Sequence, residues 1–336
     1  MLRMTTVGKS SLCALSSLLC ALPIWFCLLI ATPAGAQVDE YPSKPIRIVV
    51  PLAAGGTGDT MARLLADTMS GDLGKRIVVE NRAGSGGTIG TDVVAKSAPD
   101  GYTLALVGTS HCMNATLQKL PYDPITDFTP IALVANTPSV LIVHPSVPAN
   151  SVQEFIALAK QKPGSINYGS AGNGSTPHLH AELFKIMTGV NLVHVPYKGS
   201  TPARVAVMSG EVQADFDGLL PSLPLIKEGK VRALGVTNAR RTAVAPDIPT
   251  IAESGVPGYV ADSWYMLLAP AKTPKPISDK LYAMVQHALQ SPAMKSRLTT
   301  LGADPGTGTP EELIKLLQSE IPKWGNVIRE AKIKIY

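Results

Sequence analysis

The stretch IRIVVPLAAGGTGDTMARLL, residues 46–65, joins three local patterns. The β-branched run at 46–50 predicts a strand, and the apolar residues with helical spacing at its end predict a helix. Between them lie three glycines, Gly55, Gly56 and Gly58. Glycine lets backbone N–H groups turn toward a ligand, and the start of a helix leaves its first N–H groups unpaired at a positive dipole end. The stretch therefore predicts an anion-binding loop.

A second stretch, INYGSAGNGSTPHLHAELF at 166–184, repeats the order of strand, glycine loop and helix. Thr176 and Pro177 are typical of an N-cap and a first helical position. Neither loop has the lysine of a P-loop or the spacing of a dinucleotide motif, and neither has Arg or Lys among its glycines. A carboxylate suits such loops better than a phosphate does. Two facing loops at the carboxyl ends of strands would suit a dicarboxylate.

Strand and helix patterns alternate along the rest of the chain. Expected strands are 46–50, 77–80, 103–107, 131–135, 140–144, 166–168, 192–195, 214–216, 231–236 and 264–269. Expected helices include 60–69, 152–161, 177–187, 202–209, 278–290 and 311–328. This alternation predicts an α/β fold with mostly parallel sheets flanked by helices.

A chain of 336 residues normally forms more than one compact domain. Proline-rich segments around 137–138 and 246–258 are the expected crossings between two lobes. Two crossings make the first lobe discontinuous. The predicted division is 37–138 plus 259–336 for the first lobe and 139–258 for the second, with a hinge between them.

The first 36 residues have the pattern of a signal peptide: a basic start, an apolar run at 12–30 and an Ala34-Gly35-Ala36 cleavage site. We expect export to the periplasm; an uncleaved membrane anchor is the alternative. Three of the four cysteines fall in this leader, which leaves Cys112 without a disulfide partner and gives no zinc-type cluster. The net charge of +5 is scattered, so nucleic acid is not an expected partner. No cofactor is predicted.

Other polar residues near strand ends have two interpretations each. Asp59 is either a helix cap or a partner for a ligand amine, and Asp217 either contacts ligand or holds its own loop. His178 and His180, two apart on a helix, point to different faces and do not form a metal pair. Lys198 is the cation expected nearest a strand end, most simply as a solvated turn residue.

The segment 108–112, GTSHC, raises the question of a nucleophile. It lacks the G-x-S-x-G elbow, and no acid at a suitable spacing completes a triad. We expect Thr109 and Ser110 to serve as hydroxyl or amide contacts.

Several runs together resemble the substrate-binding receptors of tripartite tricarboxylate transporters, also called Bug-type receptors. The matching runs are YPSKPIRIVVPLAAGG (41–56), VVENRAGSGGTIG (78–90), APDGYTL (98–104), YGSAGNGS (168–175), HVPYKG (194–199), DFD (215–217) and SWY (263–265). The resemblance implies a periplasmic, monomeric two-lobe receptor of the type II binding-protein fold, which closes on a small organic acid and delivers it to a membrane permease. Leu52 and the pair at 111–112 depart from the family pattern, which leaves the identity of the acid open.

The resemblance also implies a set of ligand contacts. In the first lobe they are Ala54, Gly55, Gly56, Thr57 and Asp59; in the second they are Ser170, Ala171, Gly174, Ser175 and His178, with Thr109 and Asp217 nearby. Affinity then comes from binding alone, with no catalytic or metal-binding residue. The alternatives are a sensory receptor that docks on a signalling partner and a cleft hydrolase that uses Ser110 or Cys112 with a histidine.

Overall fold

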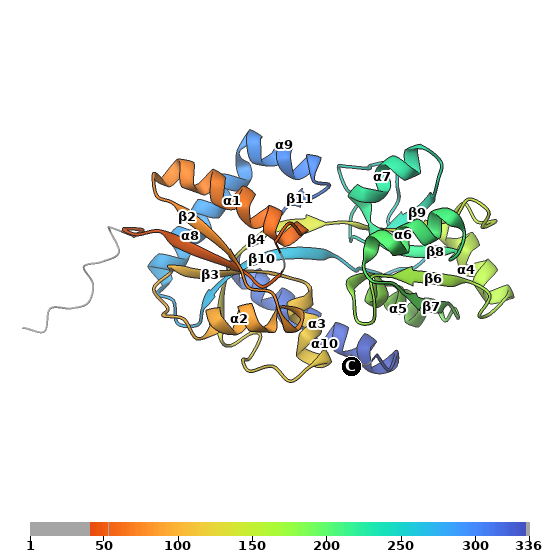
Figure 1. Cartoon of the computed structure of the whole chain (residues 1–336), viewed down its shortest axis with the longest axis horizontal. Helices are drawn as coiled ribbons and strands as arrows, with labels where there is room; N and C mark the ends of the chain where they lie inside the picture. The colour runs from red at the N-terminus through yellow and green to blue at the C-terminus, as the bar shows by residue number, and fades with distance from the viewer. Residues whose placement is uncertain (1–40, 53, 334–336) are drawn as a thin grey trace, which may run out of the picture. The chain divides into compact units, whose positions relative to one another are not determined.

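The predicted alternation of strands and helices is present in the computed structural model shown in Figure 1. The structure describes residues 41–52 and 54–333, which belong to one compact unit. The predicted signal peptide, residues 1–36, lies outside the described residues. Within the described part of the chain, no helix combines the length and the apolar character needed to cross a membrane.

The first sheet has six strands in the order β11-β4-β10-β3-β1-β2. Their bounds are β1 Ile46–Val50, β2 Ile77–Asn81, β3 Thr103–Gly108, β4 Phe128–Thr137, β10 Ser263–Pro270 and β11 Asp304–Pro305. β1 runs parallel to β2 and β3, whereas β10 runs antiparallel to both β3 and β4. The first glycine loop follows β1 directly, in the middle of this parallel group.

The second sheet has five strands in the order β7-β6-β8-β5-β9. Their bounds are β5 Ser139–Val143, β6 Asn167–Ser170, β7 Val193–Pro196, β8 Ala214–Gly218 and β9 Arg232–Val236. β6 is parallel to β7 and β8, and β5 is antiparallel to β8 and β9. The α/β fold is confirmed, but both sheets are mixed rather than mostly parallel. β10 and β11 run against the other strands of the first sheet, and β5 runs against the other strands of the second. At the crossings, β4 leaves the first sheet, β10 returns to it, and β5 enters the second.

Ten helices of four residues or more occur in the described chain. They are α1 Thr57–Leu73, α2 Thr88–Ala95, α3 Ser110–Leu117, α4 Val152–Gln161, α5 Thr176–Thr188, α6 Ser200–Ser209, α7 Leu219–Lys227, α8 Lys275–Gln290, α9 Pro292–Thr300 and α10 Pro310–Glu330, with a short 3₁₀ turn, η1, at Ser85–Gly87. The six expected helices are all present. The sequence missed α2, α3, α7 and α9, which are short; α7 contains two prolines, a pattern that reads locally as a breaker.

The two passages between the sheets lie side by side. Only Pro138 separates β4 from β5, and the return runs from the end of β9 to the start of β10. The Ser139 N–H donates to Thr237 Oγ1 at 3.3 Å, and the Thr237 N–H donates to Ser139 O at 2.9 Å. The Thr137 hydroxyl donates to Ser263 O at 3.2 Å. These bonds tie the outgoing and returning chain together; the division into lobes 37–138 plus 259–336 and 139–258 stays a prediction.

The C-terminal helix α10 packs against α3 beside the first sheet and against α5 beside the second. Trp324 of α10 is fully buried in a cluster that includes residues from both sides. Its ring stacks on His180 of α5, with the ring centroids 5.7 Å apart, and its indole N–H donates to Glu320 at 2.7 Å. One hydrophobic interface therefore joins elements of both sheets.

We predict that Trp324→Ala lowers the free energy of unfolding by about 3–5 kcal/mol, because it removes a buried aromatic side chain and leaves a cavity. Ile314→Ala on the same helix is the matched control, since 37 % of the Ile314 side chain is exposed. Urea denaturation of both variants measures the difference. Equal losses in the two variants would contradict the bridging role of Trp324.

Candidate ligand-binding site

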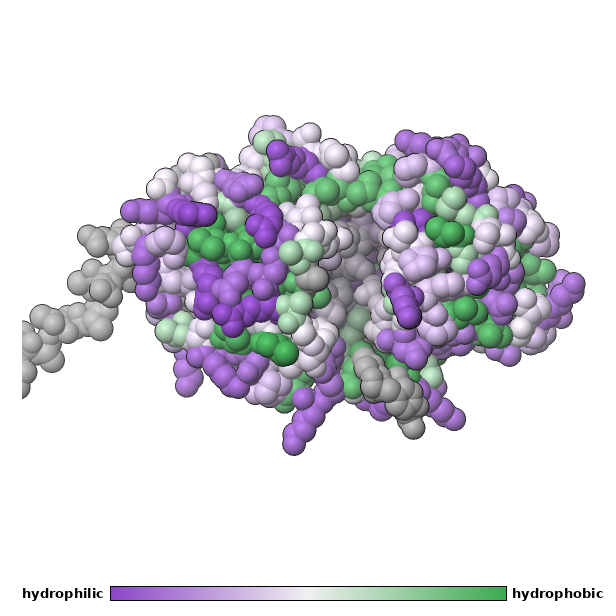
Figure 2. All heavy atoms as spheres, in the orientation of Figure 1, coloured by the Kyte–Doolittle hydropathy of each residue, from purple (hydrophilic) through white to green (hydrophobic). Residues whose placement is uncertain are grey.

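A cavity of about 600 Å³ is lined by residues from the elements of both sheets. A hollow is visible near the middle of the face drawn in Figure 2. The first glycine loop contributes Thr57, and the second contributes Ala171, Gly174 and Ser175. The two loops that share a sequence pattern therefore meet at one cavity.

Five helices begin at the wall of this cavity: α1, α3, α5, α6 and α7. Each follows the carboxyl end of a strand, and the cavity-lining residues at their first positions are Thr57, Ser110, Thr176, Ser200 and Leu219. None of the five has an N-cap side chain that accepts a hydrogen bond from its first turn. Helix starts carry positive partial charge. The cavity is therefore surrounded by backbone donors suited to an anion.

Three of the five described helices that begin elsewhere are capped by a side chain, whereas α2 and α8 are not. The hydroxyls of Ser151, Ser291 and Thr309 accept from the first turns of α4, α9 and α10. These three residues do not line the cavity. The chain thus caps these three helices with its own side chains. The five helix starts at the cavity have no side-chain cap; among them, the Leu219 N–H of α7 donates to the Pro138 carbonyl at 3.0 Å.

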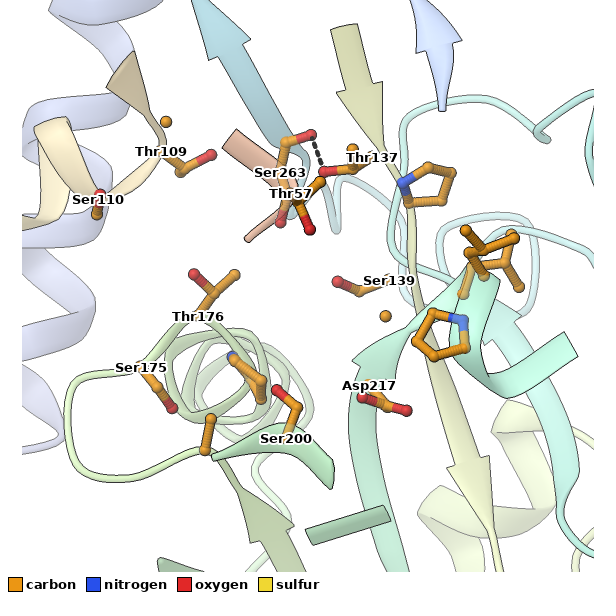
Figure 3. Close-up of a pocket in the computed structure, with 18 of the residues that line it drawn as sticks. Thr57, Thr109, Ser110, Thr137, Ser139, Ser175, Thr176, Ser200, Asp217 and Ser263 are labelled. Carbon is orange, nitrogen blue, oxygen red and sulfur yellow. Dashed lines mark hydrogen bonds between the residues drawn. The ribbon is translucent and has the colours of Figure 1, made fainter. Parts of the chain in front are cut away.

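Hydroxyl side chains from both sheets surround the same space, as Figure 3 shows. Thr57 and Ser263 lie on one side, and Ser139 and Thr176 lie across from them. The hydroxyl of Thr109 is already occupied: it accepts from the Trp264 N–H at 3.0 Å and donates to a carbonyl at 3.4 Å. Thr109 lines the cavity, but its side chain holds β3 against β10.

The first glycine loop is braced by its own residues. The Gly55 N–H donates to a carboxylate oxygen of Asp59 at 2.9 Å, and Arg63 pairs with the same carboxylate at 3.0 Å. Burial opposes ionisation of Asp59, but the bonds from Arg63 and Gly55 outweigh it and lower the pKa of this carboxyl group. Asp59 therefore stabilises the conformation of the loop through Gly55 and does not line the cavity.

The second loop is braced in the same way. The Gly174 N–H donates to Nδ1 of His178 at 3.0 Å, again four residues along. His178 stacks on His194 with ring centroids 3.8 Å apart, and Ser170 Oγ lies 2.6 Å from Nε2 of His194. Burial, and then the charge of Lys185, lowers the pKa of His178 to about 4, which keeps its Nδ1 available as an acceptor near neutral pH.

The structure thus separates the residues predicted as contacts into two groups. Those that line the cavity are Thr57, Thr109, Ala171, Gly174, Ser175 and Asp217. Those that do not are Ala54, Gly55, Gly56, Asp59, Ser170 and His178. In the second group, Gly55, Asp59, Ser170 and His178 form the bracing bonds of the two loops.

Sequence reasoning missed Arg204, which lines the cavity and forms an ion pair with Asp217. The expected helix began at 202, whereas α6 begins at Ser200, so Ser200 and Arg204 lie one turn apart on the same face. Lys198, the cation expected nearest a strand end, is exposed and does not line the cavity.

The cleft-hydrolase alternative finds no support in the geometry. A ring nitrogen of His111 is 2.8 Å from the Pro124 carbonyl oxygen, and Cys112 is fully buried in the core. Burial raises the pKa of the Cys112 thiol well above its usual value, so a thiolate is disfavoured. Within residues 41–52 and 54–333, no cluster of three metal-binding side chains occurs.

A cavity between two α/β sheets, with several helix starts at its wall, is typical of a binding site for a small anionic ligand. The sequence pattern of one family, described as "Tripartite tricarboxylate transporter family receptor", matches residues 61–333. The chain belongs to this family, and the resemblance stated from the sequence is confirmed. Receptors of this family are periplasmic and non-enzymatic.

The chain is similar to proteins of known name or structure over most of its length. It is 39 % identical over 309 residues to "Protein BugT" of Bordetella pertussis, which covers 91 % of this chain and 94 % of that protein. A solved structure described as "R. palustris Rpa4515 with adipate" is 40 % identical, with a TM-score of 0.73 over 88 % of this chain and 99 % of that one. MatC from Rhodopseudomonas palustris with bound malate is 36 % identical, with a TM-score of 0.69 over 86 % of this chain and 100 % of that one.

We predict that acid destabilises the protein through its buried histidines. Burial lowers the pKa of His178 and His194 to about 4 and that of His180 to about 3. Because the unfolded chain titrates near pH 6.5, it binds more protons between these values, and the free energy of unfolding falls as the pH falls below about 6.5. Each histidine contributes about 1.4 kcal/mol per pH unit in that window.

His180→Phe tests this prediction, because both ring nitrogens of His180 lack partners among the described residues. The variant should keep the stacking on Trp324 and show a smaller loss of stability between pH 7 and pH 5 in urea denaturation. The same pH dependence in the variant and the wild type would contradict the assignment.

Proposed function

We propose that this protein is an exported receptor that binds a small carboxylate in the cavity between its two sheets and delivers it to a tripartite tricarboxylate-type permease. One observation carries the proposal: five helix starts without capping side chains meet at one cavity. A carboxylate has two oxygens and one charge, which a few backbone N–H groups and hydroxyls can satisfy. A binding function requires no nucleophile or metal.

Dicarboxylates are the favoured class of ligand. The two similar solved structures named above contain adipate and malate, both of which carry two carboxylates. The cavity of this chain offers donors from the helices of both sheets, so each end of such a ligand can contact a different sheet. The individual acid depends on cavity shape and on bridging water.

Closure around the ligand follows from this arrangement. We infer that lobe 37–138 plus 259–336 and lobe 139–258 move about the two adjacent crossings near Pro138 and Thr237. A ligand that contacts both lobes binds the closed form more tightly, and this difference in affinity shifts the population toward closure. The closed receptor then presents the surface that the permease recognises.

The remaining parts of the proposal concern location and assembly. Residues 1–36 act as a cleaved signal peptide, and the mature protein acts as a periplasmic monomer. Its partners are membrane permease subunits, which fits membership of the transporter-receptor family.

We predict that a thermal-shift screen of dicarboxylates, tricarboxylates, aromatic acids and acidic amino acids identifies a stabilising acid. A ligand at a hundredfold excess over its dissociation constant adds about 2.7 kcal/mol to stability. Mass spectrometry should recover the acid unchanged after incubation. Stabilisation by none of these acids, or conversion of the bound acid, would refute the receptor function.

We predict that Thr57→Pro weakens carboxylate binding about tenfold or more, because a backbone hydrogen bond to a charged group contributes about 1.5–3 kcal/mol. Proline at the first helical position removes the N–H while preserving the helix, and Gly56 already has an extended conformation. Thr57→Val is the matched control, since it removes the hydroxyl but keeps the N–H. Calorimetry on both variants isolates the backbone donor; equal affinities would contradict its role.

A further inference from the structure

The cavity contains a charge pair that the helix starts do not explain. Arg204 of α6 binds Asp217 of β8 through two nitrogens: Nε contacts one carboxylate oxygen, and Nη2 lies 3.1 Å from the other. Both residues line the cavity. The Asp217 side chain is fully buried, and 14 % of the Arg204 side chain is exposed. Burying two charges at a cavity wall carries a desolvation penalty. The donors and acceptors of the pair that remain unpaired therefore indicate which ligand groups it can bind.

The hydrogen-bonding capacity of Asp217 is largely taken up. Its carboxylate accepts two bonds from Arg204, and the Ser222 hydroxyl donates to it at 2.7 Å. Three donors and one neighbouring positive charge leave little attraction for the amine of an amino acid. Asp217 therefore acts mainly as the support of Arg204.

Arg204, in contrast, has donors to spare. A guanidinium carries five N–H groups in one plane, and Asp217 binds the edge formed by Nε and Nη2. Among the described residues, nothing accepts from Nη1, and the side chain reaches the cavity. A guanidinium held on one edge by a carboxylate can bind a second carboxylate on the other edge.

The neighbouring acid does not compete for this cation. Asp215 lies two residues before Asp217 on β8 and is fully buried, and neither of its carboxyl oxygens has a hydrogen-bond partner among the described residues. Burial, and then the negative charge of Asp217, raises the pKa of Asp215 well above its usual value, which favours the neutral form.

The position of the pair also leaves room for an extended ligand. Figure 3 shows Asp217 on the opposite side of the drawn pocket from Thr109 and Ser110, where α3 begins. The cavity volume of about 600 Å³ is within the range of small-molecule sites. An acid with two ends can therefore reach a helix start with one carboxylate and Arg204 with the other.

We infer that Arg204, held in place by Asp217, binds the second carboxylate of a dicarboxylate ligand and determines that this receptor selects diacids over monoacids. The inference rests on the proposed carboxylate-binding function. It assigns the selection to one side chain, whereas the helix starts supply binding that any carboxylate shares.

Matched acids test the inference directly. Calorimetry measures succinate, glutarate and adipate against butyrate, pentanoate and hexanoate, so that each diacid has a monoacid of the same chain length. The wild type should bind its best diacid at least tenfold more tightly than the matching monoacid. Binding of monoacids as tight as that of diacids would overturn the inference and leave the proposed function standing; binding of neither class would overturn both.

The variant that isolates the side chain is Arg204→Met combined with Asp217→Asn, because removing Arg204 alone would leave a buried, unpaired carboxylate. In the double variant the diacid preference should fall to threefold or less, while the affinity for the matching monoacid stays within about twofold of the wild type. Retained monoacid binding shows that the cavity is intact. A full diacid preference in this variant would overturn the inference.

Arg204→Lys is the second variant, since it keeps the charge beside Asp217 and loses the planar fork. It should show a diacid preference between those of the wild type and the double variant. A preference equal to that of the wild type would show that charge alone, without the second edge of the guanidinium, selects the ligand, and it would contradict the geometry proposed here.

Discussion

Unpaired backbone N–H groups at the starts of helices are the feature on which the site depends. α1 and α3 start at the first sheet, and α5, α6 and α7 start at the second, each after the carboxyl end of a strand. No N-cap side chain accepts a hydrogen bond from these first turns, so the N–H groups that lack a backbone acceptor, as the Leu219 N–H has in Pro138, need water or a ligand as partners. The aligned dipoles add a preference for negative charge. The fold thereby creates an anion site with few charged side chains at its surface.

The two glycine loops contribute shape as much as donors. In each loop the N–H of a glycine is bound by the side chain four residues later, Asp59 for Gly55 and His178 for Gly174. Both glycines have positive φ, +80° and +71°, which other residues rarely adopt. Each loop is therefore held in one conformation by its own residues, and such preorganisation reduces the entropy that a loop loses when it binds a ligand. Both loops use a hydrogen bond from a glycine N–H to a side chain four residues later; the acceptor is a carboxylate in the first loop and an imidazole in the second.

Two sets of contacts connect the two sheets. The two passages, at Pro138 and at Thr237, are joined by hydrogen bonds between Ser139 and Thr237, which places the proposed hinge at adjacent segments. The packing of α10 on both α3 and α5 adds a hydrophobic contact that joins the two sheets away from these passages.

Local patterns in the sequence determined most of the backbone. The β-branched run of β1 and the helical spacing of α4 have the bounds that were expected, and both glycine loops were recognised from residue type alone. These features depend on φ/ψ preference and on neighbouring side chains. α1 starts at Thr57, three residues before the expected start. The sequence did not predict this start because the adjacent glycines have low helix propensity. Only the tertiary structure decided that Asp59 and His178 brace the loops, that Arg204 binds Asp217 at the cavity, and that both sheets are mixed, because pairing and burial depend on residues that the chain brings together from distant positions.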